Sequence, residues 1–317
     1  MRTVDSVKAL LADSDPAADL VGNPARRQRD LEKIVLADRT DAAVPRPAVP
    51  VLRRKRLLVP LGALAAGAAA ALVFGLLPGG TASTAHAVTP PLLSYQAPAT
   101  TTPAPQLLEE IAQRTAALSE PDGPDAVLEW KEWSLFTRID GNRVSSRVMA
   151  EDRKVVIHAD GSGTLTRAFE GEKGKTEPHE RGLYPDPVPA DPDALRAVLR
   201  RSTPAVDDPA GAAEALRGLL RAQALSPGQR AAVLRLIAAL PGLRHDGTVV
   251  DRAGRLGEAV SAESARSGLP SRYTFIIDPA TGRILGDEDM LTESAGALNV
   301  PVPSVISYTS YLVAYRR

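Results

Sequence analysis

The chain has 317 residues, enough for one large domain or two smaller ones. Its 38 basic and 38 acidic side chains balance, so nothing in the charge favours a polyanion, and we predict no direct binding of nucleic acid. The sequence contains no cysteine, which excludes disulfides, thiolate metal centres and a cysteine nucleophile.

Residues 1–56 predict a cytoplasmic segment with two short helices and a basic end. Such a segment is too short to bury much core alone, so we expect it to be disordered or to fold on a cytoplasmic partner. The apolar positions that follow helical spacing, and would bind this partner, are Val7, Leu10, Leu11, Leu31, Ile34 and Val35.

Residues 57–77 are 21 consecutive uncharged positions, rich in Leu, Ala and Gly. A helix of that length crosses a hydrocarbon core of about 30 Å. Positive charge flanks the stretch only on its N-terminal side, since residues 78–108 contain no charged residue apart from His86. This asymmetry predicts a cytoplasmic N-terminus, an extracytoplasmic C-terminus and a single span in the cell membrane. The side chains that set this topology are Arg53, Arg54, Lys55 and Arg56.

A cleaved signal peptide is the alternative interpretation of the same stretch. Ala85-His86-Ala87 has the small-x-small form of a cleavage site. However, the apolar stretch is longer than the usual core of a signal peptide, and the preceding segment is far too long. We therefore favour a retained anchor over cleavage near Ala87.

The residues after the span divide into a spacer and a folded domain. Residues 78–105 are rich in Pro, Thr and Ala, which predicts an extended spacer. We expect an extracytoplasmic domain over 106–317. Leu107, Leu108 and Ile111 predict its first helix.

Alternating patterns then predict an antiparallel meander of four strands. The expected strands are 130–139, 144–150, 154–158 and 164–169, and turn signals lie at 140–142 and 160–163. Charged and Pro-rich residues 170–189 predict a loop.

Three helices are expected next, because an N-cap residue precedes a proline three times. These N-cap residues are Asp191, Asp208 and Ser226. Gln229 also stands three residues after Ser226, as in a capping box.

The C-terminal part again predicts strands, at 247–251, 256–260, 273–277, 283–285 and 305–315. The order of strands, helical insert and strands predicts an α+β fold outside the transmembrane helix. Its antiparallel sheet would be able to curve into a half-barrel. At the level of fold alone, the order also fits the curved sheets of lipoprotein-carrier-like domains.

No pattern in the sequence indicates catalysis, so we predict no catalytic residue, no cofactor and no metal. The four histidines stand at no recognised metal spacing. The acidic run Asp287-Glu288-Asp289 lacks the spacing of an EF-hand, and we interpret it as a solvated turn. An envelope enzyme would need a pocket that brings acids to His158 or His245.

Two stretches carry a resemblance to a known family: LPGLRHDGTVVDRAGRLGEAV at 240–260 and FIIDPATGRILGDE at 275–288. With the basic block and the helical insert, they resemble actinobacterial single-pass membrane proteins of uncharacterised function, often encoded beside extracytoplasmic-function sigma factors. The resemblance implies a regulatory or sensory protein of anti-sigma type with a sigma factor as partner. It implies no catalytic residues, and the chain lacks the His-x3-Cys-x2-Cys signature of one anti-sigma class.

Two hypotheses for the function follow. In the first, the outer domain senses a ligand or a state of the envelope, and the inner segment passes the signal to its partner. In the second, the outer domain is a binding or carrier module for an apolar ligand or lipid, held by the anchor. The predicted ligand face of that module comprises Trp133, Phe275 and Tyr308.

Overall fold

The structure is a computed structural model, and it describes residues 89–98, 102–140, 143–170, 172–179, 184 and 186–317. These residues belong to one compact unit, Leu77–Arg317. The predicted partner-binding residues between 7 and 35, the basic block at 53–56 and the predicted span at 57–77 lie outside the described residues. Within the part that is described, no helix has the length and apolar character needed to cross a membrane.

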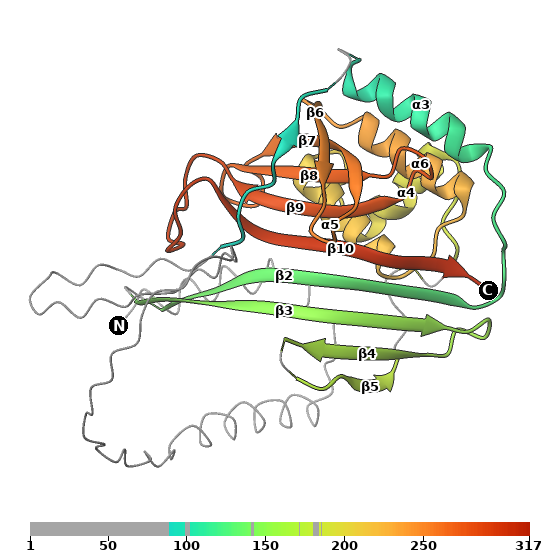
Figure 1. The fold of residues 1–317 in the computed structure, drawn as a ribbon, viewed down its shortest axis with the longest axis horizontal. Helices are drawn as coiled ribbons and strands as arrows, with labels where there is room; N and C mark the ends of the chain where they lie inside the picture. Colours follow the sequence, from blue (N-terminus) through green and yellow to red (C-terminus); the bar gives the residue numbers. More distant parts are fainter. Residues whose placement is uncertain (1–88, 99–101, 141–142, 171, 180–183, 185) are drawn as a thin grey trace, which may run out of the picture. The chain divides into compact units, whose positions relative to one another are not determined.

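One antiparallel sheet of ten strands organises the described part (Figure 1). The strand order is β1-β6-β7-β8-β9-β10-β2-β3-β4-β5, so the C-terminal strand β10 joins two halves and the sheet is not closed. The strands are β1 (Tyr95–Gln96), β2 (Ala126–Asp140), β3 (Arg143–Ile157), β4 (Gly163–Phe169), β5 (Lys175–Pro178), β6 (Arg244–Val250), β7 (Leu256–Ser264), β8 (Ser271–Ile277), β9 (Ile284–Leu291) and β10 (Ser304–Arg316).

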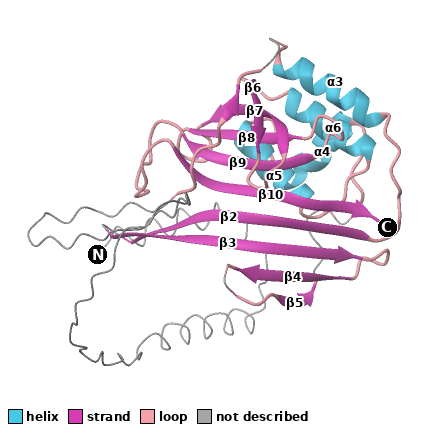
Figure 2. Ribbon diagram, viewed as in Figure 1, coloured by secondary structure: helices cyan, strands magenta, loops and turns pink. Residues whose placement is uncertain are grey.

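The helices gather over the half of the sheet formed by β6 to β10, whereas β3, β4 and β5 extend beyond them (Figure 2). They are α3 (Ala104–Ala116), α4 (Pro192–Ser202), α5 (Pro209–Leu220) and α6 (Pro227–Ala238). α6 packs between α3 and α4, and α5 packs on β7 and β8. This confirms the predicted α+β class with an antiparallel sheet and a helical insert.

The three helices of the insert begin where the N-cap signals predict. The Asp191 side chain accepts a hydrogen bond from the Ala194 amide at 2.8 Å, and Asp208 accepts one from Ala210 at 2.9 Å. Ser226 and Gln229 form the expected capping box. Each cap satisfies a backbone N–H that the first turn leaves unpaired, which stabilises the helix by about 1 kcal/mol.

The main core lies between the helices and one face of the sheet. Burial of a leucine or isoleucine side chain contributes about 1.5–3 kcal/mol, so this layer dominates the stability. Its largest fully buried side chains include Leu108, Ile111, Leu195, Leu199, Leu216, Leu219, Leu234, Phe275 and Ile277. A smaller cluster covers the outer face of the sheet, where Leu93 and Tyr95 pack on Val249, Ala259 and Ile276.

The structured domain begins earlier than the predicted boundary at residue 106. Tyr95 and Gln96, in the predicted spacer, form β1 and pair with Val249 and Thr248 of β6. The physical reason is the outer-face cluster, because Leu93 and Tyr95 bury apolar surface there. Proline and threonine content predicted an extended chain but gave no sign that it adds to a sheet.

β3 is one continuous strand, although the sequence predicted two, at 144–150 and 154–158. The charged residues 151–153 interrupt the alternation of apolar and polar residues in the sequence. In the fold, Arg153 binds Glu151 at 2.7 Å and Glu132 of β2 at 3.0 Å. These ion pairs neutralise the charged side chains, so the strand continues through them. A second difference is β5, which forms within the predicted loop at 170–189.

Candidate functional site

The sheet splits between β9 and β10. The two strands pair from Ser304–Leu291 to Ser310–Gly286 and no further. Beyond that point β10 pairs with β2 alone, with a bulge between Tyr311 and Val313. The backbone around Ile284 and Leu285 is therefore separated from the C-terminal half of β10.

Two arginines donate hydrogen bonds to backbone carbonyl groups at the split. Arg255 donates to the Tyr311 carbonyl oxygen at 2.6 Å and to the Leu285 carbonyl oxygen at 2.7 Å. Arg283 donates to the Ala314 carbonyl oxygen. The Asp251 carboxylate orients Arg255 from its other side, at 2.9 Å from Nε. The separation of β9 from the C-terminal half of β10 is thus stabilised by side chains that donate to backbone carbonyl groups.

A cavity of about 70 Å³ lies at this split, between the sheet and the α5–α6 region. Its wall includes Leu285 of β9 and Leu312 of β10, so residues at the split line the cavity together with residues of the core. A water-sized group needs roughly 10–15 Å³ of such space, which leaves room for about five. Most of the wall is apolar, and its core side includes Leu128, Leu220, Leu225, Val233, Ile284 and Val313.

Trp130 is one of the residues of this wall, and it carries a buried, unpaired donor. Only 4% of the residue is exposed, and its indole Nε1–H has no hydrogen-bond acceptor among the described residues. A buried tryptophan N–H usually has a partner, and leaving it unpaired costs about 1–3 kcal/mol. An acceptor oxygen on a bound molecule would relieve that cost.

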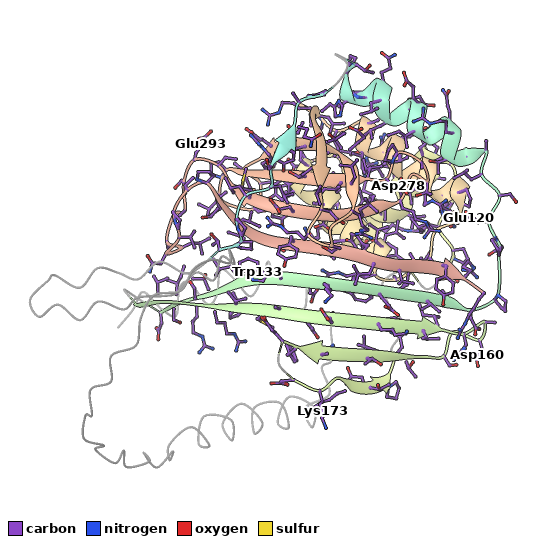
Figure 3. All side chains as sticks on the ribbon, viewed as in Figure 1. Glu120, Trp133, Asp160, Lys173, Asp278 and Glu293 are labelled. Carbon is purple, nitrogen blue, oxygen red and sulfur yellow. The ribbon has the colours of Figure 1, made fainter. Side chains whose placement is uncertain are left out.

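The arginines beside the cavity are already neutralised. Glu120, labelled in Figure 3, accepts from Arg230 at 2.7 Å and from Arg283 at 3.0 Å. The hydrogen bond from Arg230 keeps the pKa of Glu120 below its ordinary value. Glu120 is therefore ionised near neutral pH, and the site favours a neutral acceptor over an added anion.

The predicted ligand face does not form one surface. Trp133 and Tyr308 stack on each other, with ring centroids 6.0 Å apart and an interplanar angle of 1°. They pair across β2 and β10 on the face of the sheet opposite Trp130, whereas Phe275 is 2% exposed within the main core. None of the three lines the cavity.

Trp130 was the residue that sequence reasoning missed at this site. Trp130 and Trp133 lie three positions apart on an unbroken stretch of β2, so they point to opposite faces, as the alternation predicts. The pattern could not tell which face carries the cavity.

The acidic run is not a solvated turn, so that prediction was wrong. Asp287, Glu288 and Asp289 belong to β9. Asp287 and Asp289 accept from Arg217 of α5, at 2.8 Å and 2.9 Å, and Glu288 binds Arg252 at 2.6 Å. Partners distant in sequence neutralise these carboxylates, which allows the strand to be buried.

Two histidines have acidic neighbours. His158 Nδ1 lies 3.2 Å from Asp125, at a polar pocket of about 430 Å³ that also contains His179. His245 Nε2 lies 2.8 Å from Glu258. Such pairs occur in structural ion pairs as well as in catalysis, so the absence of an enzymatic role stays a prediction. No group of three or more His, Cys, Asp or Glu in the described part is arranged to hold a metal.

No family model and no curated protein matches the chain. Among solved structures, one match is a domain described as an outer membrane lipoprotein-sorting protein, from Vibrio parahaemolyticus. The match covers 65% of this chain and 91% of that one, with 12% identity and a TM-score of 0.19. A score this low supports no argument about the ligand.

Proposed function

We propose that the described domain is a binding module for an apolar ligand that carries a neutral acceptor oxygen, such as the acyl chain of an ester. The observation that carries the proposal is the unpaired indole N–H of Trp130, a residue of a mostly apolar wall whose polar members are Glu129, Gln223, Arg230, Arg255 and Arg283. The apolar side chains would bury the hydrocarbon, and the indole would donate to the carbonyl oxygen.

The size of the cavity sets how the ligand would enter. About 70 Å³ holds a short run of methylene groups, so a long acyl chain requires the wall to move. The split is the suitable place, because β9 and β10 share no backbone hydrogen bonds beyond Ser310 and Gly286. Segments with few backbone hydrogen bonds open at lower free energy than a fully paired sheet.

The predicted anchor at 57–77 fits this proposal, since it would hold the module outside the cell close to the source of acyl chains. The signalling hypothesis, with a sigma factor as partner, depends on residues 1–41 and gains no support from the described part. We therefore place the binding module first and keep the signalling role as a second prediction for the N-terminal segment.

A cavity-filling variant tests the proposal. Val233→Phe adds a ring to the cavity wall, and we expect it to weaken binding of methyl octanoate to the intact chain by at least roughly tenfold. Val198→Phe is the matched control, because Val198 packs on the core from α4 without lining the cavity. Calorimetry would measure both. Equal binding by Val233→Phe and wild type, or no binding by wild type, would contradict the proposal.

Removal of the indole N–H tests the polar contact separately. In Trp130→Phe the ring remains apolar, so we expect hydrocarbon binding to persist and the preference for the ester to fall by about 1 kcal/mol, roughly fivefold. Trp133→Phe makes the same chemical change on the other face and should leave the preference unchanged. An unchanged preference in Trp130→Phe would show that the indole does not contact the ligand.

A further inference from the structure

The β2–β3 hairpin projects beyond the rest of the sheet. β2 pairs with β10 only as far as Ser134, and β3 pairs with β4 only from Glu151 onward. Residues 135–140 and 143–148 therefore pair only with each other, as the left end of β2 and β3 in Figure 1 illustrates. A two-stranded ribbon of this kind is barely stable in water unless something packs against it.

Apolar side chains lie exposed on both faces of this ribbon. Phe136 is 51% exposed on the face that carries Trp130, and Ile139 and Val148 are 51% and 44% exposed on the opposite face. A protein groove or an added strand would cover one face or one edge of the ribbon. A lipid layer surrounds an inserted ribbon on both faces.

Basic side chains accompany the apolar ones. Residues 135–149 contain three arginines, Arg138, Arg143 and Arg147, and one acidic residue, Asp140. The Arg147 guanidinium lies 5.2 Å from the centroid of the Phe136 ring. An aromatic ring with arginines beside it suits the interface between acyl chains and anionic headgroups.

We propose that the tip of the β2–β3 hairpin, meaning residues 135–140 and 143–148, inserts into the surface of an anionic membrane. Phe136, Ile139 and Val148 would enter the interfacial layer, and Arg138 and Arg147 would remain at the headgroups with their stems along the apolar surface. This surface is separate from the cavity, so the insertion and the binding of an acyl ligand can fail independently.

The absence of cysteine makes a site-specific test direct. Ile139→Cys, labelled with an environment-sensitive fluorophore on the intact chain, is mixed with vesicles of equal parts phosphatidylglycerol and phosphatidylcholine. Leu256→Cys is the matched control, because Leu256 is an exposed apolar residue of β7, 63% accessible, in the other half of the sheet. Each variant carries one probe on an otherwise identical intact chain. Attachment of the chain to the vesicle by another segment would therefore affect the two probes equally.

We expect the probe at 139 to shift to the blue, to brighten several-fold and to be quenched by brominated acyl chains, with no change at 256. Arg138→Gln with Arg147→Gln should weaken the response by roughly tenfold. The proposal is overturned if the two probes respond alike, if neither responds, if pure phosphatidylcholine gives the full response, or if the probe at 139 is already shielded without vesicles.

Discussion

The carboxyl groups of β9 carry an electrostatic cost that the surrounding arginines only partly offset. Burial raises the pKa of Asp289, against the opposing effect of Arg217, and burial likewise raises the pKa of Glu288. A carboxyl whose pKa is raised on folding binds its proton more tightly in the folded state. Its contribution to stability is complete below the unfolded pKa and is lost as the pH rises through the folded value.

Asp289→Asn should reduce this loss. We expect the free energy of unfolding of the variant to fall less than that of wild type between about pH 4 and pH 7, because the amide cannot ionise but still accepts from Arg217. Urea unfolding at several pH values measures this. Glu120→Gln should have the opposite pH dependence. The pKa of Glu120 is lowered, so wild type loses the stabilisation by this carboxylate as the pH falls, and the variant has no such stabilisation to lose. Parallel pH profiles for wild type and Asp289→Asn would contradict the expectation.

The two tryptophans show which structural features the alternation of residues along a strand can predict and which it cannot. Alternation along β2 correctly separates Trp130 from Trp133, yet both faces of the sheet are covered by apolar clusters. A buried tryptophan is therefore compatible with either face of the sheet. The unpaired N–H that distinguishes Trp130 depends on the surrounding tertiary structure, which no local spacing contains.

At the scale of elements, the split between β9 and β10 depends on Arg255. In Arg255→Met the carbonyls of Tyr311 and Leu285 lose their donor and Asp251 loses its ion pair, so we expect a destabilisation of about 2–4 kcal/mol. Urea unfolding gives the magnitude, and faster amide exchange in the C-terminal half of β10 gives the location.

An exposed arginine provides the control for that variant. Arg244 pairs with Glu263 at 3.1 Å, and about half of each side chain is exposed. Arg244→Met should change the free energy of unfolding by less than about 0.5 kcal/mol. A loss in Arg255→Met no larger than this would mean that the split is stable without its guanidinium.

Elements with local signals were predictable, and elements that depend on distant partners were not. The starts of α4, α5 and α6 follow from N-cap residues before proline, because the capping hydrogen bonds are local. β9 was predicted to end at Leu285 but runs to Leu291 through three carboxylates. Its charge is matched by Arg217 and Arg252, which lie elsewhere in the chain.

At the scale of the whole described domain, the two proposed surfaces lie in different parts of the sheet. The cavity is at the split between β9 and β10, beneath the helical insert, and the hairpin tip is where β2 and β3 leave the other strands. Membrane contact at the tip would bring the cavity near the source of an acyl ligand. The cavity and the hairpin tip nevertheless share no residues, and a separate experiment tests each of them.

The most direct measurement of the central claim uses the two tryptophans as reporters. Trp133→Phe leaves Trp130 as the sole indole, and Trp130→Phe leaves Trp133. Titration of each intact chain with a brominated acyl ester should quench the fluorescence of Trp130 at saturation and leave that of Trp133 unchanged. Quenching of both to the same extent, or of neither, would contradict a ligand site in the cavity.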